Sequence, residues 1–195
     1  MKVFGLTGGI GMGKSAAERW LRARGVPVID TDLLAREIVE PDQPALAEIQ
    51  HAFGKEFLTS DGRLNREALA QLVFSNRDAL HRLEAITHPR IEALWQKQVA
   101  QWRSEKLRLA VVVIPLLFET AAETGLDATL CVACSPATQQ QRLAERGWNA
   151  AQIRQRIAAQ WPVEKKMARA DFVAWSEGGL EVLAAQLTRI LGLGK

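Results

Sequence analysis

Residues 8–15 read Gly-Gly-Ile-Gly-Met-Gly-Lys-Ser, and this is the most informative stretch of the chain. It matches the phosphate-binding pattern G-x-x-x-x-G-K-[ST] at every fixed position. An apolar run at residues 2–6 precedes it and predicts a short buried strand, while residues 15–24 follow with apolar side chains at helical spacing. Strand, glycine-rich loop and helix therefore occur in the order that a nucleoside-triphosphate site requires.

Each part of this loop has a physical role at a phosphate. The glycines let the backbone turn tightly, so that several N–H groups converge on the β-phosphate where the helix N-terminus adds partial positive charge. Lys14 is expected to reach the β- and γ-phosphates, and the Ser15 hydroxyl to ligate Mg²⁺. The alternative is a glycine-rich turn that ends in Lys-Ser by chance. Such a turn would not be expected to lie between a buried strand and a helix, so the sequence favours a nucleotide site.

Length and composition predict a single domain that covers residues 1–195. The formal net charge of +3 comes from lysines and arginines that are scattered along the chain. Such scatter gives little support to nucleic-acid binding and suits a polyanionic small ligand equally well. The longest apolar run, residues 109–118, is too short to span a membrane, and residues 2–10 are too short for a signal peptide. We therefore expect a cytoplasmic protein with neither a nucleic-acid nor a membrane partner.

The two cysteines, Cys131 and Cys134, form a C-x-x-C motif that can indicate redox or metal chemistry. Here the motif lies inside an apolar run, and no second Cys or His pair completes a zinc site. We interpret both residues as buried thiols of the core.

The rest of the chain alternates strands and helices, as a parallel sheet requires. Strands are predicted at residues 2–6, 26–30, 109–114, 128–134 and 172–175, and a last helix at 180–191. Continuous apolar strands indicate a sheet that is covered on both faces. The prediction is an α/β fold with a five-stranded parallel sheet and helices on both faces.

Two stretches are longer than a simple crossover between strands needs. Residues 44–106 form a long helical stretch, interrupted by a turn at residues 60–63 and by Pro89, and residues 40–106 are predicted to be a helical substrate-binding insertion. Pro89 fits the first helical position, with His88 as a cap or a packed turn residue. Residues 136–169 are rich in arginine and lysine and are the candidate lid.

Ligands bind at the carboxyl ends of the strands in an open parallel sheet. Asp30 and Asp32 follow the second predicted strand, where a carboxylate can hold Mg²⁺ or take a proton from an attacking hydroxyl. The alternative is that Thr31 or Asp32 caps the helix that follows. Glu119, after the third strand, is either a substrate contact or part of the first turn of a helix.

Arg142 and Arg146 are four residues apart and are predicted to share a helix face, which suits the clamping of phosphates by a closing lid. The alternative is that both arginines simply lie on a charged helix face exposed to solvent. The glycine-rich loop at residues 8–15 is the reason to prefer a role in a lid.

The ordered motifs resemble the dephospho-coenzyme A kinase family along nearly the whole chain. The resemblance is carried by residues 5–11, 30–32 with 35–36, 61–64 with 73–74, 88–91, 115–119, Arg142 with Arg146, 156–157 with Gln160, and 170–171. It implies transfer of the γ-phosphoryl group of ATP, with Mg²⁺, to the 3′-hydroxyl of the ribose in dephospho-coenzyme A, the last step of coenzyme A synthesis. It also implies a P-loop fold of the nucleoside-monophosphate-kinase type, with a core, a lid and substrate-binding helices.

By this resemblance Asp32 is the base, residues 8–15 bind phosphates and Arg142 is the lid arginine, although the residues alone leave Asp30 open as the base. The complete predicted site consists of catalytic Asp32, Lys14 and Arg142; nucleotide-binding Gly8, Gly9, Ile10, Gly11, Met12, Gly13, Lys14, Ser15 and Ala16; acceptor-binding Asp30, Asp32, His88, Pro115, Leu116 and Glu119; lid residues Arg142, Arg146 and Arg156; and Ser15 for the metal.

The chain departs from the family pattern in three places: Met12 replaces a usual Ser, Ala16 a usual Thr, and Trp175-Ser176 a usual Asp-Asn beside the nucleotide base. Because the Ser hydroxyl is short and rotates, discrimination between adenine and guanine is expected to weaken. Other small-molecule P-loop kinases are the main alternative. A GTPase-type switch would need N-K-x-D and D-x-x-G motifs, and the sequence contains neither.

Overall fold

The computed structural model describes residues 1–194. They divide into two compact units. One comprises residues 1–30 and the chain from Val99 onward, and the other is Thr31–Gln98. The first unit contains the whole sheet and the glycine-rich loop, so the nucleotide-binding half of the predicted site belongs to it.

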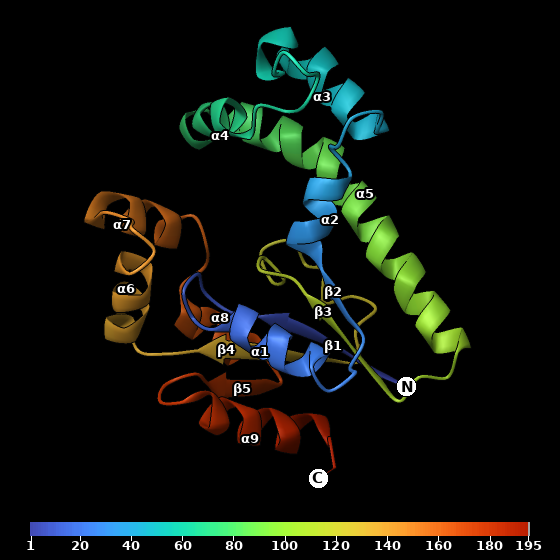
Figure 1. The fold of residues 1–195 in the computed structure, drawn as a ribbon, viewed down its shortest axis with the longest axis vertical. Coiled ribbons are helices and arrows are strands. Elements are labelled where there is room, and N and C mark those ends of the chain that lie inside the picture. Colours follow the sequence, from blue (N-terminus) through green and yellow to red (C-terminus); the bar gives the residue numbers. More distant parts are fainter. Residues whose placement is uncertain (195) are drawn as a thin grey trace. The chain divides into compact units, whose positions relative to one another are not determined.

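Five parallel strands form the sheet of the first unit, which confirms the predicted fold class (Figure 1). They are β1 (Lys2–Thr7), β2 (Val28–Asp30), β3 (Leu109–Val113), β4 (Ala128–Ala133) and β5 (Phe172–Trp175), in the spatial order β2-β3-β1-β4-β5. β2 is shorter than the predicted strand at residues 26–30. Val26 donates its N–H to the Leu21 carbonyl instead of to a strand, and Pro27 has no N–H to donate.

Helices cover both faces of this sheet, and alternate residues of β4 show how. Leu130 and Val132 belong to a core cluster with α1 (Lys14–Arg22) and α9 (Leu180–Leu191), whereas Ala133 packs with residues of α8 (Val163–Arg169). Successive side chains of a strand point to opposite faces, so the two clusters lie on opposite sides of the sheet. Both faces are therefore buried, as the continuous apolar strands predict.

The predicted stretch at residues 136–169 is helical and consists of α6 (Pro136–Ala144), α7 (Ala150–Ala158) and α8. Each of the first two begins at a capping residue. The Ser135 side chain accepts the N–H of Thr138 at 3.3 Å, and Asn149 forms a reciprocal capping box with Gln152. These caps set the start of each helix locally.

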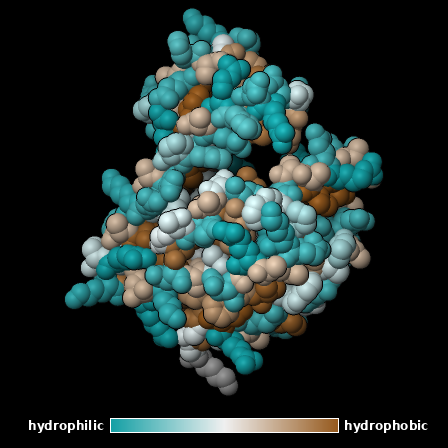
Figure 2. All heavy atoms as spheres, turned by 180° about the vertical axis from the view of Figure 1, so that it is seen from behind, coloured by the Kyte–Doolittle hydropathy of each residue, from teal (hydrophilic) through white to brown (hydrophobic). Residues whose placement is uncertain are grey.

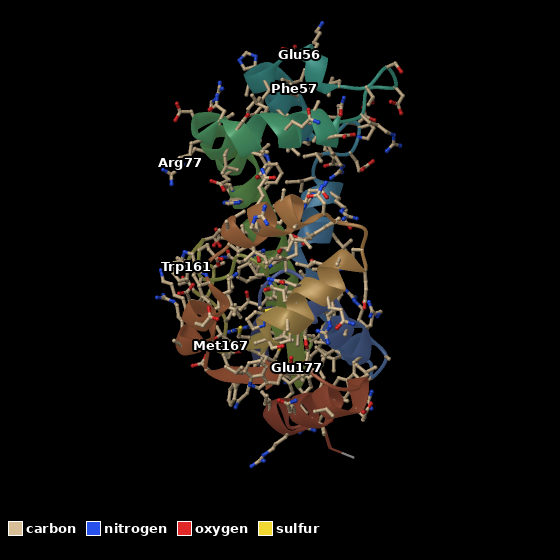
Figure 3. The ribbon with its side chains drawn as sticks, turned by 90° about the vertical axis from the view of Figure 1, so that its left-hand side faces the viewer. Glu56, Phe57, Arg77, Trp161, Met167 and Glu177 are labelled. Carbon is tan, nitrogen blue, oxygen red and sulfur yellow. The ribbon has the colours of Figure 1, made fainter. Side chains whose placement is uncertain are left out.

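The second unit contains α2 (Thr31–Glu37), α3 (Pro44–Phe53), a 3₁₀ turn (Lys55–Phe57), α4 (Arg66–Ser75) and most of α5 (Arg77–Ser104). It has its own small core, in which Phe57 packs edge-on against Phe53 with ring centroids 6.3 Å apart (Figure 3). The predicted turn at residues 60–63 is present, with Gly62 at φ +76° and its N–H bonded to the Thr59 carbonyl. Glycine adopts that conformation without strain because it has no Cβ.

The predicted interruption at Pro89 is wrong, because α5 continues through it from Arg77 to Ser104. His88 and Pro89 therefore lie inside a helix and not at its start. Proline removes one backbone hydrogen bond and costs about 3 kcal/mol in a helix interior. The carbonyl that loses its partner is that of Ala85, four residues before Pro89. Leu83, Ile86 and Ile91, on either side of Pro89, pack against the core of the second unit, and such packing overrides a local helix preference.

Hydrophilic residues are spread over the visible face of the molecule, with hydrophobic residues in small patches between them (Figure 2). No helix within residues 1–194 combines the length and the apolar character that crossing a bilayer needs.

Carboxylates hold the second residues of the neighbouring strands β1 and β4. Asp127 accepts the N–H of Val3 at 2.7 Å, and Asp171 accepts both the N–H and the hydroxyl of Thr129 at 2.7 Å. The Thr129 side chain and backbone hold the pKa of Asp171 below its ordinary value of 3.8. A carboxylate with a lowered pKa stabilises the fold above its unfolded pKa and loses that contribution as the pH falls through the folded value.

Replacing Asp171 by alanine is accordingly expected to lower the free energy of unfolding by about 1 kcal/mol at pH 7. Denaturant melts of the natural protein and of Asp171→Ala, at pH 7 and at pH 3, measure the difference in their free energies of unfolding. This difference should be smaller at pH 3, because the carboxylate of the natural protein is then partly protonated. An equal difference at both pH values would show that the charge of Asp171 contributes nothing.

Candidate active site

The loop at residues 8–15 (hereafter the P-loop) joins β1 to α1 and has the backbone that its glycines predict. Gly8 has φ +143° and Gly13 has φ +97°, both in the left-handed range. A Cβ on Gly8 would lie 2.1 Å from the Val132 carbonyl oxygen, and one on Gly13 would lie 2.7 Å from the Ser176 hydroxyl. Any side chain at these two positions would strain the backbone and collide with neighbouring atoms.

Lys14 is the first residue of α1, and its side chain curls back over the P-loop. Its Nζ donates to the carbonyl oxygens of Gly8 at 2.7 Å and Gly9 at 3.0 Å. Ser15 follows on the same first turn and is exposed. An ammonium group, a hydroxyl and the N-terminus of α1 thus meet at one loop, an arrangement that attracts phosphate oxygens.

The turn after β3 is anchored by a lysine that the sequence interpretation missed. Lys166 of α8 is fully buried; its Nζ donates to the Pro115 carbonyl at 2.7 Å and pairs with Glu119 at 2.7 Å. The backbone N–H of Trp161 donates to the same Glu119 oxygen at 2.9 Å (Trp161 is labelled in Figure 3). Residues 115–125 form turns, so the alternative of a helical first turn at Glu119 is wrong. Little in the sequence indicates that Lys166 is buried, because a single lysine on a helix is normally exposed to solvent.

Of the predicted lid arginines, Arg142 is the one whose contacts lead to the P-loop. Its guanidinium donates to the Ser176 hydroxyl at 2.8 Å and to the Ser176 carbonyl at 2.5 Å. That hydroxyl in turn donates to the Met12 carbonyl of the P-loop at 2.8 Å. Arg142 and Ser176 therefore form a hydrogen-bonded bridge between α6 and the P-loop.

Arg146 and Arg156 have different surroundings. α6 ends at Ala144, so the prediction that Arg142 and Arg146 share a helix face is wrong. Gly147, at φ +83°, completes the turn that ends the helix. Arg146 is exposed, and the exposed Arg156 stacks 4.3 Å above the Trp148 ring.

Glu177, the residue after Ser176, ties the end of β5 to the start of α6 (Figure 3). It accepts the Thr138 hydroxyl at 2.7 Å and the Ser135 N–H at 3.1 Å. The Ser135 side chain, then the Thr138 side chain and the Ser135 backbone, lower the pKa of Glu177. The segment after β5 is thereby fixed beside both α6 and the P-loop.

Asp30 is the last residue of β2 and is half-buried in the first unit. α2 begins at Thr31, two residues before the predicted helix body, so Thr31 and Asp32 form its first turn. Asp32 is exposed there, in a position where a carboxylate interacts favourably with the helix dipole. Asp32 and the half-buried His88 both belong to the second unit.

Cys131 and Cys134 are buried and form no disulfide, which confirms them as core thiols. Burial raises the pKa of Cys131 to about 11, so its thiol stays protonated at neutral pH. Among residues 1–194 no group of three or more His, Cys, Asp or Glu side chains is placed to hold a metal ion.

The family model described as dephospho-CoA kinase matches residues 2–181. A dephospho-CoA kinase from Anaeromyxobacter dehalogenans is 47% identical over 98% of this chain and 91% of that protein, and one from Bdellovibrio bacteriovorus is 41% identical over 98% and 95%.

Solved structures show the same fold. A Thermus thermophilus protein has a TM-score of 0.85 at 36% identity, covering 100% of this chain and 98% of that one. Dephospho-CoA kinase from Campylobacter jejuni has a TM-score of 0.73 at 24% identity, covering 98% and 96%; at that identity the likeness concerns the fold alone. With a P-loop kinase fold, an intact P-loop and a family match over nearly its whole length, the chain belongs to the dephospho-CoA kinase family.

Proposed function

We propose that this chain transfers the γ-phosphoryl group of ATP to the 3′-hydroxyl of the ribose in dephospho-coenzyme A, giving coenzyme A and ADP. The observation that carries the proposal is the P-loop with Lys14 folded over it, in a chain whose family match covers residues 2–181. We assign the chain to the cytoplasm.

The mechanism requires positioning and charge neutralisation and no covalent intermediate. In the proposed reaction the Lys14 ammonium leaves the carbonyls of Gly8 and Gly9 for the phosphate oxygens, where its charge stabilises the transferring group. Arg142, already fixed beside the P-loop through Ser176, adds a second positive charge. Asp32 orients the ribose hydroxyl and accepts its proton.

The residues at the carboxyl edge fit Mg²⁺. Ser15 offers an exposed hydroxyl at the start of α1, and Asp30 offers a carboxylate at the end of β2. These are hard oxygen donors, and Mg²⁺ in kinases is held by one or two such groups together with phosphate and water. Bound with ATP, the ion would neutralise phosphate charge.

For the acceptor we assign Asp30, His88, Pro115, Leu116 and Glu119, with residues 40–106 as the substrate-binding region. Residues 136–169 would form the lid, with Arg142, Arg146 and Arg156. Support for the turn at residues 115–119 comes from its anchoring: Lys166 and Trp161 hold the Glu119 carboxylate in one orientation. A rigid turn at the carboxyl edge of β3 is where a ligand of a parallel sheet is expected.

We expect GTP to be used within about tenfold of ATP in kcat/KM, since no Asn side chain stands at residue 176 to distinguish adenine from guanine. The Ser176 hydroxyl is engaged with Met12 and Arg142. Kinetics with both nucleotides, in the natural protein and in Ser176→Asn, measure the effect. A strong ATP preference that Ser176→Asn leaves unchanged would show that the base is read elsewhere.

A coupled ADP-release assay with a panel of acceptors tests the proposed function. Dephospho-coenzyme A should support turnover far above adenosine, AMP, gluconate and shikimate, and the product should carry its new phosphate on the ribose 3′ oxygen. Preference for another acceptor would assign the chain to a different small-molecule kinase activity.

A further inference from the structure

The peptide groups of Ile10, near the apex of the P-loop, are held from both sides by glutamine side chains. The Ile10 N–H donates to Oε1 of Gln160 at 2.9 Å, and the Ile10 carbonyl accepts from Nε2 of Gln139 at 2.8 Å. Gln139 comes from α6 and Gln160 from the turn between α7 and α8. Two segments far away in the sequence therefore bond the donor and the acceptor of a single residue.

The P-loop itself does little to hold this residue. Ile10 lies between Gly9 and Gly11, and glycines change their backbone conformation at little cost. One backbone hydrogen bond closes the turn around it, from the Met12 N–H to the Gly9 carbonyl at 3.2 Å. The orientation of the following N–H groups, which must converge on a phosphate, thus depends on contacts from outside the loop.

The space next to these contacts is not filled by packing. Gln139 and Gln160 line a cavity of about 450 Å³ together with Gly9 and Met12 of the P-loop. A loop that lost its glutamine contacts would therefore have room to move on this side.

α6 follows the P-loop closely and contacts it at successive residues. Gln139 bonds Ile10. Leu143, one turn further along α6, packs against Gly11 so closely that a Cβ added to Gly11 would lie 2.9 Å from the Leu143 Cγ. Arg142 reaches Met12 through Ser176. This helix thus acts as the external support for the loop.

We infer that Gln139 and Gln160 are positioning residues that hold the P-loop in its phosphate-binding conformation before the nucleotide arrives. The inference rests on the proposed function only in placing phosphates at this loop. Losing one glutamine lowers the populated fraction of the competent loop, and apparent affinity falls in proportion. One lost hydrogen bond predicts an affinity decrease of about 3- to 10-fold for ADP and ATP.

The two glutamines are expected to respond oppositely to the same substitution. Gln160 accepts a hydrogen bond, so Gln160→Glu keeps the acceptor, whereas Gln160→Leu removes it. Gln139 donates, so Gln139→Glu loses the donor and sets a carboxylate against the Ile10 carbonyl. Gln139→Met keeps the size of the side chain without the amide.

Calorimetric titration with ADP, together with KM and kcat for each substrate, tests the inference. Gln160→Leu, Gln139→Met and Gln139→Glu should bind ADP 3- to 10-fold more weakly or worse and raise KM for ATP, with kcat and KM for dephospho-coenzyme A within about twofold. Gln160→Glu keeps the acceptor but adds a negative charge, so its ADP affinity is measured at high ionic strength, where that charge is screened; there it should be close to that of the natural protein. The matched controls are Gln141→Leu, whose amide bonds only Glu145, and Gln155→Leu on the exposed side of α7.

ADP affinity within twofold of the natural protein in both Gln139→Met and Gln160→Leu would overturn the inference, even if their melting temperatures fell. So would equal weakening in Gln160→Leu and Gln160→Glu at high ionic strength, where the added charge is screened. If the buried Gln139 variants do not fold, the pair at Gln160 decides alone, because that residue is half-buried at a turn. ADP binding needs no acceptor, so a failed acceptor assignment would leave this test intact.

Discussion

Replacing Lys14 by alanine is expected to lower kcat/KM for phosphoryl transfer by about 10³-fold or more while the fold is retained. The transferring phosphoryl group carries charge on its equatorial oxygens, and Lys14 is the ammonium that reaches this loop from the first residue of α1. In the structure its Nζ is bonded to the carbonyls of Gly8 and Gly9. These neutral carbonyl partners can be exchanged for charged phosphate oxygens, and both belong to the P-loop and not to the hydrophobic core.

The measurement is ADP release with dephospho-coenzyme A, together with a thermal melt followed by circular dichroism. Lys2→Ala is the matched control, because Lys2 is an exposed lysine at the opposite end of the strand that leads into the P-loop. It should leave turnover unchanged. Normal turnover in a correctly folded Lys14→Ala protein would refute the nucleotide-site assignment.

Asp32→Asn is expected to reduce kcat by about 10²–10⁴-fold with ATP affinity and melting temperature retained, if Asp32 is the general base. Asparagine keeps the size and the hydrogen-bonding oxygen of the side chain but cannot accept the ribose proton. A purely structural role in the first turn of α2 would give the reverse pattern, a loss of about 1 kcal/mol in stability with kcat unchanged.

Asp78→Asn provides the control, because Asp78 is likewise an exposed aspartate in the first turn of a helix, α5. It measures what removing a charge from such a position does to stability. Lower stability with an intact kcat in Asp32→Asn would make Asp32 a structural residue of α2. Asp30 would then be the candidate base, and Asp30→Asn would be the variant to assay.

The sheet was predictable because a strand buried on both faces leaves a local trace in the sequence. β3, for example, has five successive buried residues, Leu109–Val113, and the predicted run at 109–114 differs from it by one residue. The P-loop was equally predictable, since its backbone needs glycine at fixed positions whatever the rest of the fold does. The prediction at Pro89 failed because local helix propensity was weighed there without the packing that sustains α5.

The sequence alone indicates the parallel sheet, the P-loop with Lys14 and Ser15, and the order of the motifs that mark the family. The side chains that support the P-loop became visible only in the folded chain: Gln139 and Gln160 bond Ile10, and Ser176 links Arg142 to Met12. The same holds for the buried Lys166, which anchors Glu119 in the turn after β3. Backbone conformation and burial of strands depend on near neighbours in the sequence and leave periodic patterns. A hydrogen bond between residues as far apart as Ile10 and Gln160 leaves no such pattern, because its partners meet only after the chain has folded.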